Sequence, residues 1–162
     1  MKKIVLNELF SSGSFRSGLK AGLMKPAVEK QLGKSLEGSY LISTPDVDYY
    51  VVEMETDANL TVIFDKARRC DVVKISMKEN LDRTLVIQLG EQEEVIDKNT
   101  SFDRLIEILL ALNIEWEFDR AKVFLQVVCI RFKNGLRLFY AFGNKSENDH
   151  GLFEISSNLE IV

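Results

Sequence analysis

The spacing of apolar residues predicts an amphipathic helix in the second half of the chain. Between 101 and 113, in "SFDRLIEILLALN", apolar residues recur every three or four positions, which is the spacing of one buried helix face. Thr100 or Ser101 is placed to cap the first turn of this helix, and Asp103 adds a negative charge there that suits the helix dipole.

The first third of the chain is predicted to hold shorter helices. Proline is tolerated in a first helical turn and Gly33 suits a C-cap, so a helix is expected from Pro26 to Leu32. Residues 6 to 22 have helix-spaced apolar positions interrupted at 11–14, and short helical pieces around that Gly/Ser turn are expected.

Most of the remaining chain has the composition and alternation of β-strands. Two meanders are expected, one before the long helix and one after it, with a further strand pair in front of the helix. The predicted strands cover residues 47–55, 60–64, 72–77, 84–89, 93–96, 114–119, 123–132, 136–142 and 152–156. We therefore expect an α+β fold, mainly of antiparallel sheet with a few helices packed on one face.

Two short stretches carry sharper predictions. In "IEWEFD" the strict alternation sends apolar residues to one side of a strand and carboxylates to the other. The apolar set is Ile114, Trp116 and Phe118, and the carboxylates are Glu115, Glu117 and Asp119. Asn134 and Gly135 predict a tight hairpin with a type I′ turn, because both central residues of that turn need positive φ.

The helix-and-meander pattern occurs twice. A shift of 76 positions carries the hairpin at 51–65 onto the one that begins at Val127, with apolar positions preserved, and carries the first predicted helix onto the long one. We therefore expect a single domain over 1–162 with two related halves, at about 24–78 and 100–157. The alternative is that any two meanders of this kind align as well.

Composition is typical of a compact soluble protein. Of 162 residues, 46% are hydrophobic and 28% are charged. The N-terminal "MKKIVLNELF" lacks the apolar stretch of a signal peptide, and the longest apolar run, Ile108–Leu112, is far shorter than the ~20 residues of a membrane-spanning helix. We expect a cytoplasmic protein without membrane contact, in which Cys70 and Cys129 are buried free thiols.

Charge is distributed unevenly along the chain. Up to Ser39 there are seven Lys or Arg against three Glu, whereas the rest has 14 basic against 22 acidic residues, and the total is −4. Nucleic acid is bound chiefly by neutralising its phosphates with Lys and Arg, so the acidic main part argues against a nucleic-acid partner. It suits a basic protein partner better, although acidity also simply keeps a domain soluble.

No residue pattern predicts a catalytic, cofactor or metal site. A catalytic triad or a Cys-His nucleophile requires a histidine, and the only one, His150, lies in the polar loop "SENDHG". One histidine and two strand-buried cysteines do not make a zinc site. The stretch "GSFRSGLK" at 13–20 lacks the adjacent Gly-Lys pair that a phosphate-binding loop needs.

Two hypotheses about function, from two different classes of protein, stay open. Asp46 and Asp48 are a carboxylate pair suited to Mg²⁺ or to acid/base work, although such a pair is more often a solvated turn. A minimal enzyme would need both side chains to meet His150 in space. The second reading is a small-ligand-binding or regulatory module with a cleft between the two halves.

The second half of the chain resembles a known class of bacterial proteins. The helix and short strand of "TSFDRLIEILLALNIEWEFDR", followed by a strand pair ending "GLRLFYAFGN", are similar to immunity proteins of contact-dependent inhibition and polymorphic-toxin systems. The resemblance covers about the last 65 residues and is one of pattern. It implies a protein that is not an enzyme and that binds and occludes a cognate toxin, often a nuclease with a basic cleft.

The resemblance implies that outward acidic residues are the candidates for toxin binding, because complementary charge speeds encounter and selects the partner. An aromatic anchor is also typical of a tight interface. The predicted acidic set is Glu91, Glu93, Glu94, Asp97, Glu115, Glu117 and Asp119, and the aromatic candidates are Tyr49 and Tyr50, one of which faces outward in a strand.

Overall fold

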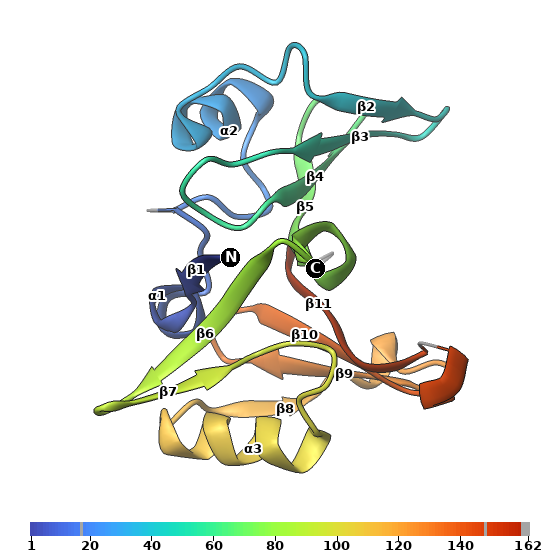
Figure 1. Ribbon diagram of the computed structural model, residues 1–162. Coiled ribbons are helices and arrows are strands. Elements are labelled where there is room, and N and C mark those ends of the chain that lie inside the picture. Colours follow the sequence, from blue (N-terminus) through green and yellow to red (C-terminus); the bar gives the residue numbers. More distant parts are fainter. Residues whose placement is uncertain (17, 148, 160–162) are drawn as a thin grey trace.

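The computed structural model describes residues 1–16, 18–147 and 149–159, and within them the chain forms two sheets and three α-helices (Figure 1). The smaller sheet has the order β1-β6-β7, and the larger has the order β2-β3-β4-β5-β11-β10-β9-β8. The strands are β1 Lys2–Val5, β2 Tyr40–Ser43, β3 Val47–Val52, β4 Leu60–Asp65, β5 Cys70–Ser76, β6 Arg83–Leu89, β7 Gln92–Val95, β8 Trp116–Phe118, β9 Val127–Phe132, β10 Leu136–Phe142 and β11 His150–Asn158. The helices are α1 Asn7–Ser12, α2 Lys25–Leu32 and α3 Phe102–Ala111, with 3-10 turns at Met77–Asn80, Arg120–Lys122 and Lys145–Glu147. The α+β prediction is confirmed.

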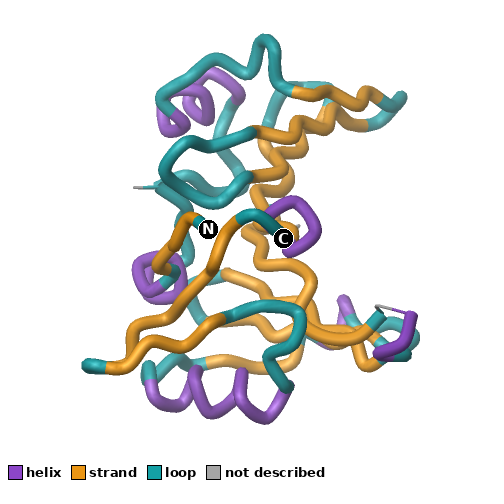
Figure 2. The backbone as a smooth tube through the Cα atoms, viewed as in Figure 1, coloured by secondary structure: helices purple, strands orange, loops and turns teal. Residues whose placement is uncertain are grey.

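The large sheet consists of two meanders placed side by side. Strands β2 to β5 form one and β8 to β11 the other, all pairs are antiparallel, and β5 pairs with β11 at the centre. Helix α2 precedes the first meander in sequence and α3 precedes the second. Figure 2 distinguishes the helices, in purple, from the strands, in orange. The strand order is therefore symmetric about the central β5–β11 pair, with β2 corresponding to β8 and β5 to β11.

The strand registers extend this correspondence. The second strand of each hairpin keeps the predicted offset of 76, and both carry a β-bulge at equivalent places, Ile63/Phe64 and Phe139/Tyr140. The first strands are offset by 80, because the pair Tyr50↔Val62 corresponds to Ile130↔Leu138. The predicted match of Val51 with Val127 is therefore wrong by four positions. Because four is an even number, equivalent side chains still lie on the same face of the sheet. A common origin of the halves stays a hypothesis.

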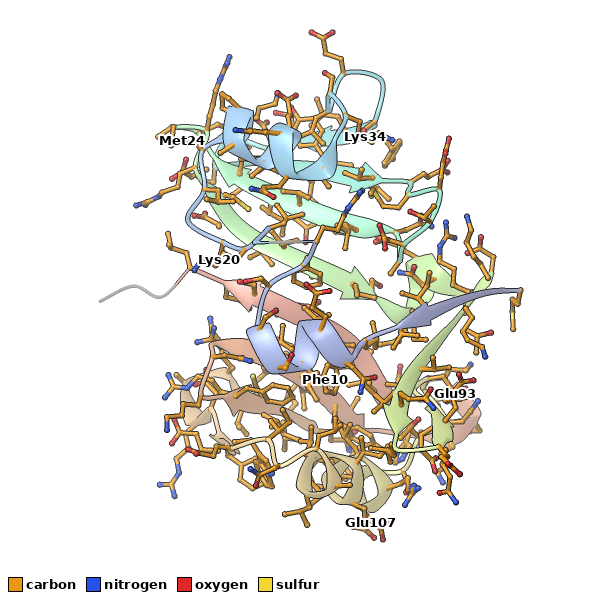
Figure 3. The ribbon with its side chains drawn as sticks, turned by 90° about the vertical axis from the view of Figure 1, so that its left-hand side faces the viewer. Phe10, Lys20, Met24, Lys34, Glu93 and Glu107 are labelled. Atoms are coloured by element: carbon orange, nitrogen blue, oxygen red, sulfur yellow. The ribbon has the colours of Figure 1, made fainter. Side chains whose placement is uncertain are left out.

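The main core lies on one face of the large sheet. Apolar side chains of all three α-helices and of the small sheet pack against that face in one continuous cluster. Figure 3 shows α1, with Phe10 labelled, lying over the strands, and the Phe10 ring meets that of Phe132 edge to face at 5.3 Å. Burial of this apolar surface supplies the main favourable free energy of folding. Helix α3 contributes its stripe of Leu105, Ile108 and Leu109.

Local signals placed the helix ends correctly. Helix α2 has proline in its first turn and ends at Gly33 in the left-handed conformation, with φ of 69°. The Ser101 hydroxyl accepts a hydrogen bond from the Arg104 amide and caps α3. Within the described ranges, no helix has the length and apolar character to cross a membrane.

Other local predictions need correction. Of the helical pieces expected in 6–22, α1 forms, but the described residues after it, 13–16 and 18–22, form no helix, and a backbone bridge joins Phe15 to Leu19. Strand β1, which pairs in parallel with β6, was not predicted. The hairpin after β9 has a three-residue loop, 133–135, with positive φ only at Gly135, so the type I′ turn is wrong. Instead the Asn134 amide donates to the carbonyl of Phe10 in α1.

Candidate protein-binding surface

The carboxylates of β8 lie on the face of the sheet opposite the main core, as the alternation predicted. Glu115 and Glu117 are exposed, but each has a cationic partner on β9 or just after it. Lys133 Nζ lies 3.1 Å from the Glu115 carboxylate, and Arg131 pairs with Glu117. Two open hollows border this row of ion pairs. The surface along β8 is therefore polar and charge-balanced rather than acidic.

Asp119 is not the outward residue that the pattern predicted. Its carboxylate accepts a 2.9 Å hydrogen bond from Arg137 Nε, and the two side chains are only 11% and 6% exposed. Burial by itself would raise the pKa of Asp119, but the hydrogen bond and positive charge of Arg137 hold that pKa below its usual value. Asp119 thus anchors the chain after β8 to β10.

The second predicted acidic group belongs to the small sheet and is also largely engaged. Glu93 pairs with Lys3 at 2.9 Å, and Glu94 pairs with Arg104 on α3. The Asp97 carboxylate accepts bonds from the amides of Asn99 and Thr100 and so closes the turn before α3. The remaining member, Glu91, is exposed in the turn between β6 and β7. The seven acidic residues therefore do not form one unpaired patch.

The two tyrosines of β3 point to opposite faces, as expected for adjacent strand residues. Tyr50 is buried in the core cluster, where its ring meets Phe64 and its hydroxyl accepts a bond from Lys25 Nζ. Tyr49 is half-buried on the other face, with Lys74 Nζ 5.7 Å from its ring centre. Of the two, only Tyr49 is accessible as a contact residue.

An exposed apolar surface lies where β8 ends and β9 begins. Five large apolar side chains reach solvent there; we call them the β8-end surface, and they are Phe118, Val123, Phe124, Leu125 and Phe142. Phe102 at the start of α3 links part of this set, because its ring lies 6.4 Å from that of Phe118 and 5.1 Å from that of Phe142. Phe118 was predicted to face inward but is 47% exposed, because β8 is an outer strand of the large sheet.

The tip of this surface is held in a strained conformation. Phe124 and Val127 exchange two backbone hydrogen bonds of 3.3 and 2.9 Å, which closes a two-residue turn made of Leu125 and Gln126. Leu125 has φ of 48° and is 98% exposed. For a residue other than glycine, the left-handed region costs about 1–2 kcal/mol. This turn therefore presents a leucine fully to solvent at a local conformational cost, which is the kind of outlier from which a function can be inferred.

The residues of the minimal-enzyme reading do not meet. Asp48 on β3 binds Ser43 and Lys66, and these bonds lower its pKa. His150 begins β11, which β4 and β5 separate from β3. Three strand spacings of about 4.8 Å place the two residues about 14 Å apart or more, beyond the reach of acid/base cooperation.

The other candidate groups are placed as follows. Cys70 and Cys129 are buried free thiols, as expected, and burial raises the pKa of each to about 12. Among residues 1–16, 18–147 and 149–159, no group of three or more His, Cys, Asp or Glu side chains is arranged to hold a metal ion. The two hollows lie along β8 and β9 rather than at the β5–β11 junction, where the ligand-binding reading expects its cleft.

Comparison with known proteins gives no further assignment. No family model, curated protein or solved structure matches the chain.

Proposed function

We propose that this chain is an immunity protein, which binds a cognate bacterial toxin domain through the β8-end surface and neutralises it by covering its active site or an adjacent surface. The observation that carries the binding role is the strained, fully exposed Leu125 beside exposed aromatic rings. Exposed apolar patches of this kind mark protein interaction sites, and central apolar anchors dominate the affinity of interfaces. The resemblance of the second half to immunity proteins supplies the class of partner.

The charge of this chain gives only limited support to a basic toxin, such as a nuclease, as the partner. Because Glu115 and Glu117 are paired with Lys133 and Arg131, they add little unpaired charge to the surface. The net charge of −4 still attracts a basic partner at long range and raises the rate of encounter. We therefore propose that the apolar tip at Leu125 supplies the affinity for the toxin. The polar row of ion pairs along β8 would orient the toxin on this surface.

Leu125→Gly separates binding from folding. Glycine adopts the positive φ of this turn without strain, so the free energy of unfolding should be unchanged or rise by up to about 1 kcal/mol. Removal of the exposed side chain should weaken binding of the toxin domain at least tenfold. Urea denaturation gives the first quantity and isothermal titration calorimetry gives the second.

Leu81→Gly is the matched control, because Leu81 is also highly exposed but lies just after the 3-10 turn Met77–Asn80, far along the chain from β8. Its toxin affinity should equal that of the wild type. Equal affinities of Leu125→Gly and the wild type would remove the tip from the interface.

Charge reversal tests the polar row along β8. The double variant Glu115→Lys and Glu117→Lys places four cations where two ion pairs now lie, and it should weaken binding of a basic toxin domain by more than tenfold. The reversal Glu93→Lys on the small sheet changes an exposed ion pair of the same kind and should leave the affinity unaltered. Unchanged affinity of the double variant would place the toxin elsewhere.

The function itself is tested by co-expression. The toxin domain used as the probe is the C-terminal domain encoded by the reading frame next to this gene in its native genome. Expressed alone in a laboratory host, it should arrest growth, and co-expression of this chain should restore growth and give a complex that co-purifies. A toxic neighbouring domain that this chain neither binds nor neutralises would overturn the proposal.

A further inference from the structure

Asn134 and Gly135, in the turn between β9 and β10, form a chemically reactive pair. Glycine has no Cβ to hinder its backbone nitrogen, so an asparagine that precedes glycine loses its side-chain amide more readily than other asparagines do. Asn134 is the only asparagine of the sequence that precedes a glycine. The two-residue turn expected from this pair does not form, so the role of the Asn134 side chain lies elsewhere.

The Asn134 side chain holds the C-terminal end of α1. Its Nδ2 group donates hydrogen bonds to the carbonyl of Phe10 at 2.9 Å and to that of Ser11 at 3.2 Å. Carbonyls in the last turn of a helix have no partner within the helix. Asn134 therefore caps α1 from a position 124 residues beyond Phe10, and it joins the helix to the second meander.

The same turn restrains the other atoms that loss of the amide would involve. The Gly135 amide donates to the carbonyl of Phe132 at 3.0 Å, and Oδ1 of Asn134 accepts a bond of 3.1 Å from the Leu136 amide. Attack by the Gly135 nitrogen on the side chain requires the first of these bonds to break. Departure of Nδ2 requires the two bonds to α1 to break. The closed structure therefore retards the reaction.

We propose that Asn134 is a site of spontaneous deamidation that the α1 contact protects, and that its conversion leaves α1 detached from the second meander. The backbone nitrogen of Gly135 attacks Cγ of Asn134 and forms an N–Cγ bond. The Cγ–Nδ2 bond breaks, the proton of the Gly135 amide passes to Nδ2 through solvent, and Nδ2 leaves as ammonia. Water then opens the cyclic imide at either carbonyl carbon and gives aspartate or isoaspartate.

The product cannot restore the contact with α1. A carboxylate at pH 7 only accepts hydrogen bonds, so it would face the carbonyl oxygens of Phe10 and Ser11 without a donor. Negative charge is also unfavourable at the C-terminal end of a helix. Each opening of the contact thus exposes Asn134 to an irreversible step, and the fraction of closed molecules falls with the age of the protein.

Peptide mapping by mass spectrometry tests the site and its protection. The full chain is aged in mildly alkaline buffer, either folded or unfolded in guanidinium chloride. Asn134 should deamidate at least tenfold more slowly in the folded chain than in the unfolded one. Asn144, which precedes a lysine, is the internal reference and should stay intact in both. Equal rates at Asn134 would overturn the protection, and an intact Asn134 in the unfolded chain would overturn the site.

Gly13→Ala tests whether α1 provides the protection. A Cβ atom at Gly13 would lie 2.7 Å from the carbonyl oxygen of Asn134 and 2.8 Å from its Cγ, so the substitution forces the two segments apart. Deamidation in native buffer should be at least threefold faster than in the wild type. Gly33→Ala is the matched control, because Gly33 ends α2 with nearly the same φ, +69° against +71°, but no atom of the described residues lies within 4 Å of its added Cβ. Wild-type rates in both variants would overturn the role of α1.

Asn134→Asp tests the consequence without any ageing. Hydrogen exchange of the Phe10 and Gly13 amides, which bond within α1, should become at least tenfold faster. Asn144→Asp is the matched control, since it makes the same chemical change where Ser146 uses only the oxygen Oδ1, which aspartate retains. It should leave exchange in α1 unchanged. Wild-type exchange in Asn134→Asp would refute the detachment of α1. These measurements need no toxin, so their outcome is independent of the proposed function.

Discussion

Replacement of Gly151 by alanine is expected to cost about 3–5 kcal/mol of unfolding free energy, a large part of the 5–15 kcal/mol typical of a domain. A Cβ atom at this position would lie 1.8 Å from the carbonyl oxygen of Lys98, and φ is +112°. The turn before α3 packs directly on the backbone of β11 at this point, so neither segment can move without disturbing the sheet or the helix. Urea denaturation followed by circular dichroism measures the effect.

Gly38→Ala isolates the steric part of this cost. Gly38 also has positive φ, +84°, but no atom lies within 4 Å of the added Cβ. Its substitution should therefore cost only the conformational strain of about 1–2 kcal/mol. Equal losses for the two variants would show that the contact with Lys98 has no energetic role.

Asp119→Ala is expected to destabilise the protein by about 3 kcal/mol, because it removes the carboxylate from Arg137, a cation that is only 6% exposed. Glu117→Ala, two residues earlier on the same face, is the matched control. Its pair with Arg131 is 63% and 38% exposed, so its loss should cost less than about 1 kcal/mol. Chemical denaturation at pH 7 compares the two variants, and equal losses would contradict the burial argument.

The Asp119–Arg137 ion pair also predicts that the stability of the fold depends on pH. The pKa of Asp119 is lowered in the folded state, so its ionised form stabilises the fold above the ordinary carboxyl pKa near 3.8. That stability is lost as pH falls through the lowered folded value. The stability difference between the wild type and Asp119→Asn should therefore be constant from pH 7 to 5 and shrink below pH 4. A difference independent of pH down to 3 would mean that the charge of Asp119 does not contribute.

Elements with strong local signals could be predicted, and those set by distant contacts could not. Helix α3 has a cap and a complete apolar stripe, and most strands of the two meanders are rich in β-forming residues, so their approximate positions followed from the sequence. Strand β2, Tyr40–Ser43, was not predicted. Strand β1 depends on parallel pairing with β6, about 80 residues away, and no local pattern reports that pairing. The sheet order likewise depends on the β5–β11 pairing across the two halves.

The candidate surface likewise depends on distant contacts that the local sequence does not predict. "VFLQVVCIRF" has the composition of one long strand, and no Gly, Pro or Asn marks the turn at Leu125. The bonds between Phe124 and Val127 close this turn, and the Gln126 carbonyl accepts a bond from the Phe142 amide, a contact from outside the segment. For Asp119, alternation predicted the correct face, but its burial depends on Arg137, which lies 18 positions further along the chain.

The central position of β11 has a consequence for the order in which the protein is made. Residues 150–158 are synthesised after both meanders' other strands, yet they form the strand that joins β5 to β10. Until they leave the ribosome, the first meander exposes the edge of β5 as well as that of β2, and the second exposes the edge of β10. The nascent chain therefore passes through a stage with several open strand edges, which is the state most prone to aggregation and most dependent on chaperones. Completion of the large sheet therefore has to await residues 150–158, which are made after every other strand of that sheet.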